Sequence, residues 1–273
     1  MFLALAHEIP KNIAWPLPQC DHQVNIVNAN EYYLVSNICP HQNSKITQCA
    51  TDKLKCPYHG MSFDINGNGI NNGFSLPTSK TYQSQSMLFD SPVNYTFPID
   101  LQHMKLIEQR VDIVDAPAEI IMDVFLDIDH IPVAHEGVYD QIGIEQISKI
   151  SWETFDNGSL QFVVPDRVDH IIPQDLQYNL GAVWMAVYPD TMIEWQPGAL
   201  FVTVVKQKQT HSCVYVYKYR DLRYSDQSWA LNDQVWELAW SQDRKLAQGI
   251  ESLALSNIDV LKQHYRTYIK NAL

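Results

Sequence analysis

The sequence predicts a chain of the α+β class, in which an all-β N-terminal domain precedes an α+β domain with a mainly antiparallel sheet. Three observations lead to this prediction. Short β-rich runs and turns fill about the first hundred residues, a helix with clear start and stop signals follows residue 115, and further β-rich runs precede a helical C-terminal stretch. The chain has 273 residues, which is long enough for two domains that each bury a core.

The first predicted domain covers residues 1–98 and the second covers residues 99–273. Within the first, residues 24–27 and 32–35 are rich in β-formers and flank a polar turn, so we expect a hairpin. Residues 61–65 alternate between apolar and polar side chains, and a glycine-containing turn follows them. Prolines punctuate the chain near residue 95, where we place the domain boundary.

The first helix of the second domain is predicted from its capping residues and its apolar face. Asp115 can cap the N-terminus, and Pro117 stands in the first turn, where a missing N–H has no cost. Pro132 ends the helix. The apolar face consists of Ile120, Ile121, Val124, Phe125 and Ile128. Strands are then predicted at residues 160–164, 183–188, 192–195, 200–205 and 214–219, and the stretch from about Leu231 is predicted to be helical.

The composition excludes some classes of partner. The formal net charge is −12, which argues against binding to nucleic acid or to anionic membrane surfaces. The sequence contains no apolar run that could span a bilayer, and its first residues lack the basic start and the apolar length of a signal peptide. Of the 5 cysteines, those outside the motif described next form no disulfide framework, so we expect a cytoplasmic protein.

Two cysteines and two histidines form the strongest motif, divided between two short segments. One residue separates Cys39 from His41, and two residues separate Cys56 from His59. A [2Fe–2S] cluster of the Rieske type needs this donor set, with two thiolates on one iron and two imidazoles on the other. A Cys2His2 zinc site is the alternative, but zinc modules usually keep their cysteines and their histidines in separate pairs. The spacing therefore favours the iron–sulfur cluster.

A second group of ionisable residues lies on and after the predicted helix. Asp123, Asp127 and His130 stand at positions i, i+4 and i+7, so they would share one helical face. His135 follows beyond the proline. A solvated acidic face with an incidental histidine would explain this pattern. A metal site would explain it as well, since one class of non-haem Fe(II) site uses two histidines and one carboxylate. His130 and His135 could provide the two imidazoles.

The third ligand of such a site would come from the C-terminal helix. The candidates are Asp233, Glu237 and Asp243. At helical spacing, Asp243 falls in an apolar row, whereas the other two carboxylates belong to the polar side. The row consists of Trp236, Trp240, Asp243, Ala247 and Ile250. A carboxylate in a buried row is costly unless a partner such as a metal ion compensates its charge, so Asp243 is favoured.

The pattern Cys-Pro-His followed by Cys-Pro-Tyr-His-Gly resembles the Rieske domain of Rieske non-haem iron oxygenases, which are ring-hydroxylating and demethylating enzymes. The later pattern Asp-x3-Asp-x2-His-x4-His resembles the iron motif of the same family and lies in the expected order. Residues 242–246 are similar to the family's Glu-Asp motif, with Gln242 in place of the first acid. The resemblance implies an oxygenase α subunit, in which a helix-grip-like catalytic domain follows the Rieske domain.

The resemblance also implies cofactors and roles for residues of this chain. A [2Fe–2S] cluster would be held by Cys39, His41, Cys56 and His59. A mononuclear Fe(II) would be held by His130, His135 and Asp243. Asp127 would link His59 to His130 across the subunit boundary of a homotrimer. Asp123 would lie close behind the iron ligands.

The family's chemistry would use O2 as co-substrate and electrons from NAD(P)H, delivered by a separate reductase or ferredoxin. The product would be a hydroxylated or demethylated small organic molecule, and the short chain favours monooxygenation over dihydroxylation. Residues 188–192 are similar to the choline- and betaine-oxidising branch, so a quaternary ammonium compound stands beside an aromatic compound as substrate class. A Rieske-type electron carrier or a catalytically inactive homologue is the alternative function, and the iron motif argues against both.

The sequence departs from the family's usual pattern near the cluster motif. Gln42 and Asn43 stand where the family usually has Arg and Gly, and Met61 stands where Trp is common. The chain is also shorter than most α subunits. These differences bear on the redox potential of the cluster, on the docking of the electron donor and on substrate choice, rather than on the presence of the cluster.

Overall fold

The computed structural model describes residues 1–11, 13–20, 23–28, 31–46, 48–50, 53–138, 144–167, 181–251 and 260–272. The chain divides into two compact units, Phe2–Gln102 and His103–Leu273, and Met1 belongs with the second. The boundary proposed from the sequence lies after residue 98. Among the described residues, the structure contains no helix with the length and apolar character needed to cross a membrane.

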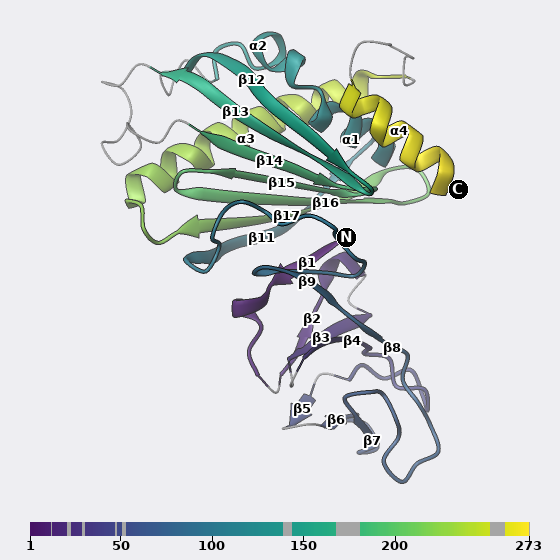
Figure 1. Cartoon of the computed structure of the whole chain (residues 1–273). Helices are drawn as coiled ribbons and strands as arrows, with labels where there is room; N and C mark the ends of the chain where they lie inside the picture. The colour runs from purple at the N-terminus through teal and green to yellow at the C-terminus, as the bar shows by residue number, and fades with distance from the viewer. Residues whose placement is uncertain are drawn as a thin grey trace. The chain divides into compact units, whose positions relative to one another are not determined.

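The described residues of the N-terminal unit form three small antiparallel sheets (Figure 1). Their strand orders are β1-β10-β9, β2-β3-β4-β8 and β5-β6-β7. The predicted hairpin is confirmed, because β3 pairs with β4 in antiparallel register and Asn28 lies opposite Tyr32. The elements of this unit are β1 (Phe2–Leu5), the 3-10 helix η1 (Ala6–Glu8), β2 (Ala14–Pro16), the 3-10 helix η2 (Pro18–Cys20), β3 (Val24–Asn28), β4 (Tyr32–Ser36), β5 (Gln48–Ala50), β6 (Lys53–Lys55), β7 (Ser62–Asp64), β8 (Thr78–Lys80), β9 (Tyr82–Ser84) and β10 (Met87–Phe89).

In the part of the C-terminal unit that the structure describes, one antiparallel sheet has 7 strands in the order β11-β17-β16-β15-β14-β13-β12. The five predicted strands are confirmed as β13 to β17, and the α+β class is confirmed with them. The sequence analysis did not predict β11, although its side chains alternate between exposed and half-buried along most of the strand. The strands are β11 (Met104–Val114), β12 (Ile144–Phe155), β13 (Gly158–Arg167), β14 (Ala182–Val187), β15 (Thr191–Gln196), β16 (Ala199–Gln207) and β17 (Ser212–Asp221).

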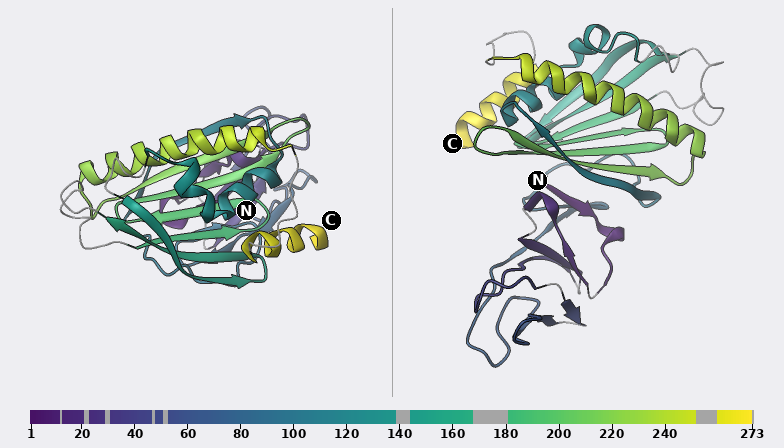
Figure 2. Two further views of the ribbon diagram at one scale, coloured as in Figure 1. Left: turned by 90° about the horizontal axis from the view of Figure 1, so that it is seen from above. Right: turned by 180° about the vertical axis from the view of Figure 1, so that it is seen from behind.

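Helices cover one face of this sheet, and the long helix α3 runs across it (Figure 2). The helices are α1 (Ala118–Leu126), the 3-10 helix η3 (Ile128–His130), α2 (Ile131–Ala134), α3 (Asp226–Gly249) and α4 (Val260–Ala272). Helix α3 begins before the predicted Leu231, because Ser225 caps it. The Ser225 hydroxyl accepts a hydrogen bond from the N–H of Ser228 at 3.1 Å.

Helix α1 differs from its prediction at both ends. The predicted cap by Asp115 is wrong: the cap residue is Pro117, and the free N–H of Ala118 donates to the side-chain oxygen of Gln207 at 2.8 Å. The prediction that the helix reaches Pro132 is also wrong. The chain leaves the helical conformation at Asp127, whose carboxylate accepts the N–H of residue 129 at 3.2 Å. This local turn competes with the helix, so Asp123, Asp127 and His130 do not share one helical face.

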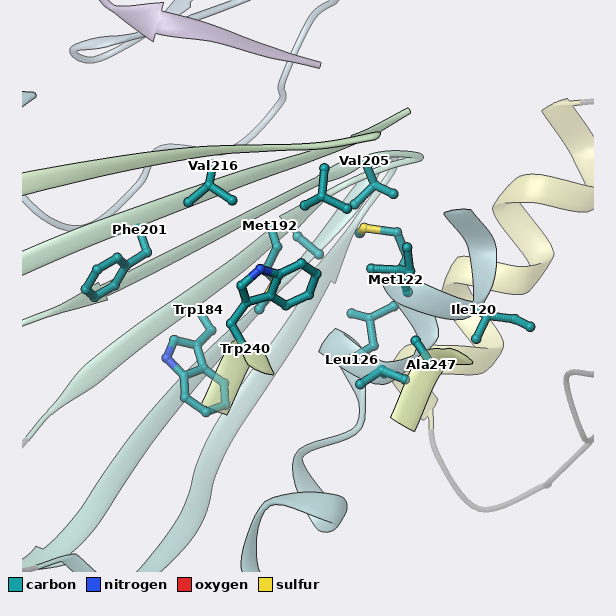
Figure 3. Close-up of a cluster of buried hydrophobic side chains, with 14 of the residues drawn as sticks. Ile120, Met122, Leu126, Trp184, Met192, Phe201, Val205, Val216, Trp240 and Ala247 are labelled. Carbon is teal, nitrogen blue, oxygen red and sulfur yellow. The ribbon is translucent and has the colours of Figure 1, made fainter. Parts of the chain in front are cut away.

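The core of the C-terminal unit lies between the sheet and its helices. Buried side chains from α1, α3 and α4 pack against β14, β15, β16 and β17. Figure 3 shows these side chains meeting between the layers, including Met122, Leu126, Met192, Phe201, Trp240 and Ala247. Each buried aromatic or aliphatic side chain contributes about 1.5–3 kcal/mol of transfer free energy, so this layer fixes the positions of α1 and α3.

Two loops of the N-terminal unit share one hydrogen-bonded frame, and each begins at a cysteine of the motif. In each loop, the cysteine N–H donates to the carbonyl five residues further on, and the N–H four residues on donates to the cysteine carbonyl. The N···O distances are 2.9 and 2.9 Å around Cys39, and 2.8 and 3.0 Å around Cys56. The two loops are therefore copies of one type of turn.

The fourth residue after each cysteine has a left-handed backbone. Asn43 has φ 54° and Gly60 has φ 72°. Asparagine tolerates this conformation better than most residues, which explains how Asn43 can stand where the family usually has glycine. A Cβ atom on Gly60 would meet the Cε atom of Lys55 at 3.7 Å, an ordinary contact. Position 60 therefore favours glycine for its backbone conformation and not for space.

We predict that Gly60→Ala lowers the stability of the N-terminal unit by about 1 kcal/mol, because alanine must adopt a left-handed conformation. Gly60→Asn is the matched control and should lose clearly less, since Asn43 already occupies the equivalent place. Urea unfolding of the full chain measures both effects. Equal losses for the two variants, or no loss for alanine, would contradict the backbone explanation.

Candidate functional site

The first candidate site lies on the two cysteine loops. The Cys39 and Cys56 side chains belong to the core of the N-terminal unit, with each residue 1% exposed, and their thiols are within hydrogen-bonding reach of each other. His41 and His59 are exposed, and their ring centroids are 4.8 Å apart. Two buried thiols and two outer imidazoles are the donors that a Rieske [2Fe–2S] cluster requires. These four residues therefore fit that cofactor.

Backbone N–H groups are directed at both sulfur atoms in the same way. The N–H groups two and three residues after each cysteine hydrogen-bond to its sulfur. Burial opposes the thiolate of Cys56, but these bonds outweigh burial and lower its pKa. Burial together with the neighbouring sulfur raises the pKa of Cys39, and the same bonds only partly offset this. The loops thus supply hydrogen bonds that would stabilise thiolate ligands.

The second candidate site lies in the C-terminal unit, where the structure brings His130, His135 and Asp243 together. The two Nε2 atoms are 3.1 Å apart, and each lies 3.1 Å from Oδ1 of Asp243. His130 ends η3, His135 follows α2, and Asp243 is on α3. Ligand atoms of all three fall within 4.8 Å of one another, which suits a single metal ion.

Hydrogen bonds on the far side of each ring orient the two imidazoles. Nδ1 of His130 donates to the backbone carbonyl of Asp127, and Nδ1 of His135 donates to Oε1 of Gln242 at 2.8 Å. A proton on Nδ1 leaves the lone pair of Nε2 directed at the site, as a metal ligand requires. Gln242, which stands where the family usually has an acid, therefore orients the imidazole of His135.

The charge of Asp243 is compensated by the two imidazoles. The side chain is buried, which opposes its ionisation, but hydrogen bonds from His130 and His135, donated when Nε2 carries a proton in the metal-free site, lower its pKa. Burial opposes the charge of His135, and the hydrogen bond and negative charge of Asp243 outweigh burial and raise the pKa of His135. The donor set of two imidazoles and one buried carboxylate fits a mononuclear Fe(II) site.

The two other carboxylates considered for this site lie elsewhere. Asp233 and Glu237 both contact the amino group of Lys218, which is 1% exposed, and Asp233 does so at 2.5 Å. Glu237 also accepts from Arg110 at 2.5 and 3.1 Å. These ion pairs fasten α3 to β11 and β17, so the carboxylates already have cationic partners. Asp243 is the candidate that the structure places beside the histidines.

Asp123 and Asp127 lie near this site without contributing their carboxylates to it. Asp123 is buried and forms a bidentate ion pair with Arg266. Asp127 is half-buried, and its carboxylate accepts from Lys262 at 2.5 Å. It is the backbone carbonyl of Asp127, and not its carboxylate, that contacts His130. The link between Asp127 and a cluster histidine stays a proposal.

Glu194 is a site residue that the sequence analysis missed. It lies on β15 and lines the same cavity as His130, His135 and Asp243. The aromatic and thioether side chains that complete the wall are Phe125, Trp184, Met192, Trp236 and Trp240. Burial and the charge of Asp243 raise the pKa of Glu194 to about 7, although a hydrogen bond from Trp236 partly offsets them. A carboxylate inside an apolar strand was the signal that could have found it.

Comparisons with known proteins bear on the N-terminal unit and on the fold of the chain. Residues 1–83 match the family model of the Rieske [2Fe–2S] domain. No curated protein sequence matches the chain. The structure is similar to the quaternary ammonium Rieske monooxygenase CntA in complex with inhibitor MMV12, with a TM-score of 0.70 and 16% identity over 100% of this chain and 87% of that chain.

Two further solved structures share the fold. Dicamba monooxygenase bound to dicamba has a TM-score of 0.57 and 13% identity, over 99% of this chain and 95% of that chain. The QL mutant of Pseudomonas putida CBB5 NdmA with caffeine has a TM-score of 0.51 and 15% identity, over 90% of this chain and 79% of that chain. This chain therefore contains a Rieske [2Fe–2S] domain and has the fold of a Rieske oxygenase α subunit, as its motifs predict.

Proposed function

We propose that the chain is a terminal oxygenase component that hydroxylates or demethylates a small organic substrate with O2. The observation that carries this proposal is the convergence of His130, His135 and Asp243 in one cavity. It occurs in a chain that also presents two buried thiols and two exposed imidazoles on paired loops. The two donor sets together are what a Rieske oxygenase needs, and each alone would be less specific.

Two separate groups of residues would hold the two metal centres. Cys39, His41, Cys56 and His59 would hold the [2Fe–2S] cluster, and His130, His135 and Asp243 would hold Fe(II). When bound, the cluster would supply single electrons and the Fe(II) would supply O2 activation. The side chains of the cavity wall would exclude water and orient the substrate beside the histidines.

Electrons would come from NAD(P)H through a separate reductase or ferredoxin. The exposed position of His41 and His59 supports an exchange of electrons at the surface of the N-terminal unit. We further propose that Asp127 links His59 of a neighbouring subunit to His130 in a homotrimer. Two features support this role: Asp127 lines the cavity, and it contacts His130 through its backbone carbonyl.

A Rieske-type electron carrier without oxygen chemistry is the alternative function. A carrier has no need of a second donor set. The side chain of Asp243 is 12% exposed, and its two imidazole partners are each held by a hydrogen bond on the far ring nitrogen. Such a pre-oriented arrangement is costly to assemble without a ligand, so it favours the oxygenase.

Turnover under 18O2 tests the oxygenase proposal and the role of Asp127 together. The chain, loaded with both metal centres and given a two-electron reductant, should place one atom of 18O2 in a hydroxylated amine or aromatic product and release the other atom as water. Asp127→Ala, loaded with excess Fe(II) so that both centres are filled, should lose at least about 100-fold in product formation, since the carboxylate that would reach His59 of the neighbouring subunit is removed. Asp129→Ala, which removes an exposed neighbouring carboxylate, is the matched control and should retain activity. Product oxygen that comes from water would contradict the oxygenase proposal. Unchanged turnover in Asp127→Ala would contradict the role of Asp127 as a link between subunits.

Within this function, Glu194 favours a cationic substrate over a neutral aromatic one. The described residues provide no ion-pair partner for its carboxylate, whose recorded hydrogen bond comes from Nε1 of Trp236 at 3.4 Å. Indole faces attract cations, and Trp184, Trp236 and Trp240 line the same cavity. One of the similar structures is named a quaternary ammonium Rieske monooxygenase, which agrees with this choice.

We predict that choline or a similar quaternary ammonium ion binds in this cavity at a pH above the raised pKa of Glu194, where the carboxylate is ionised. Glu194→Gln should then weaken its binding about tenfold, because the carboxylate charge is lost. The neutral isostere 3,3-dimethylbutanol is the control ligand, and the substitution should change its affinity little. Calorimetric titration of the full chain measures both affinities. Preference for the neutral ligand, or an equal change for both ligands, would refute the cationic substrate class.

A further inference from the structure

Helix α4 places two basic side chains against two acidic ones from the region of α1. Lys262 and Arg266 are one helical turn apart, so they lie on the same face of α4. Their side chains are only 12% and 18% exposed. They meet Asp123 and Asp127, which makes a group of four charges that sums to zero. Because the group is largely shielded from water, its ion pairs are stronger than pairs on an open surface.

The two basic residues bind different carboxylates of this group. Arg266 holds Asp123 through a bidentate contact, with N–O distances of 2.8 Å to each carboxylate oxygen. Lys262 holds Asp127, with its amino group 2.5 Å from Oδ2, and lies 3.6 Å from Asp123. Within the described part of the chain, the carboxylate of Asp123 contacts Arg266 and Lys262 and not the histidines or Asp243. The pair Lys262–Asp127 is therefore the one that adjoins that site.

Asp127 transmits its position directly to a candidate metal ligand. One carboxylate oxygen is fixed by Lys262, the other accepts the N–H of Asp129 at 3.2 Å, and the backbone carbonyl accepts Nδ1–H of His130. The carboxylate and the backbone carbonyl of Asp127 are thus both hydrogen-bonded, and the carbonyl fixes the rotation of the His130 ring. Any displacement of residue 127 changes the direction in which Nε2 of His130 points.

The amino group of Lys262 is itself held in place by the packing of α4. Leu261 and Tyr265, which are one helical turn apart on the neighbouring face of α4, are buried in the core at 0% and 2% exposed. The hydroxyl of Tyr265 donates to the carbonyl of Pro189 at 3.2 Å. Because the helix is anchored in this way, a change at Lys262 alters the contact with Asp127 without freeing α4.

We infer that Lys262 is a positioning residue of the candidate metal site: through Asp127 it fixes the imidazole of His130 in the orientation that binds the metal. Arg266, by contrast, contributes to the packing of α4 on α1 and not to the site. This inference rests on the proposed function, because it takes His130, His135 and Asp243 to be metal ligands. It extends the site to a helix that contributes no ligand.

Two readouts separate positioning from packing. The full chain is prepared with its cluster and stripped of metal at the second site, and Mn(II) is titrated against it by the EPR signal of free Mn(II). Lys262→Met should weaken Mn(II) binding about tenfold, at the low end of the effect of outer partners of metal ligands. Lys262→Arg, which can still donate to Asp127, should recover most of the affinity. Arg266→Met is the matched control: it should lower the melting temperature at least as much as Lys262→Met and leave Mn(II) affinity unchanged.

The outcomes distinguish this inference from the proposed function. If wild type binds Mn(II) no better than Asp243→Asn, the metal site itself is refuted. If wild type binds and Lys262→Met binds equally well, the metal site stands and the positioning role is refuted. If both methionine variants lose affinity in proportion to their loss of melting temperature, the effect of Lys262 is packing and the inference is again overturned. Loss of affinity in Lys262→Met with rescue by arginine supports it.

Discussion

The buried charge of Asp243 is the constraint on which the C-terminal unit depends. Helix α3 presents this carboxylate from a row of apolar side chains, where an uncompensated charge would cost several kcal/mol. His130 and His135 meet it from η3 and the end of α2. Each imidazole is in turn held by an acceptor at Nδ1. The elements η3, α2 and α3 therefore have a defined arrangement because one buried carboxylate needs partners that compensate its charge.

In the N-terminal unit, backbone hydrogen bonds orient the candidate metal donors. The two cysteine loops repeat the same pair of N–H···O bonds and the same left-handed residue, and both aim N–H groups at a sulfur atom. The thiols are consequently buried and the imidazoles exposed. In both units, hydrogen bonds to other groups of the protein orient the candidate metal donors. Metal sites with defined chemistry require donors that are oriented in this way.

The candidate metal donors could be predicted because they are close together in the sequence or stand at helical spacing in an apolar row. The motif from Cys39 to His59 was found from its residue types and spacing, and Asp243 from helical periodicity together with the resemblance of residues 242–246 to a family motif. Contacts between distant segments were not predictable in this way. Asp115 looked like a cap, but Gln207 of β16 supplies the contact to the first turn of α1. The end of α1 depends on the turn at Asp127 and on Lys262 of α4, and Glu194 joins the site only through the order of strands in the sheet.

The central claim is that one chain carries both a Rieske cluster and a separate mononuclear iron site. Iron and acid-labile sulfide content per chain, measured on protein assembled under anaerobic conditions, tests it most directly. We expect about three irons and about two sulfides per chain, falling to about two irons with unchanged sulfide in His135→Ala. About two irons in the unaltered chain would make it an electron carrier, and zinc without sulfide would remove the cluster as well.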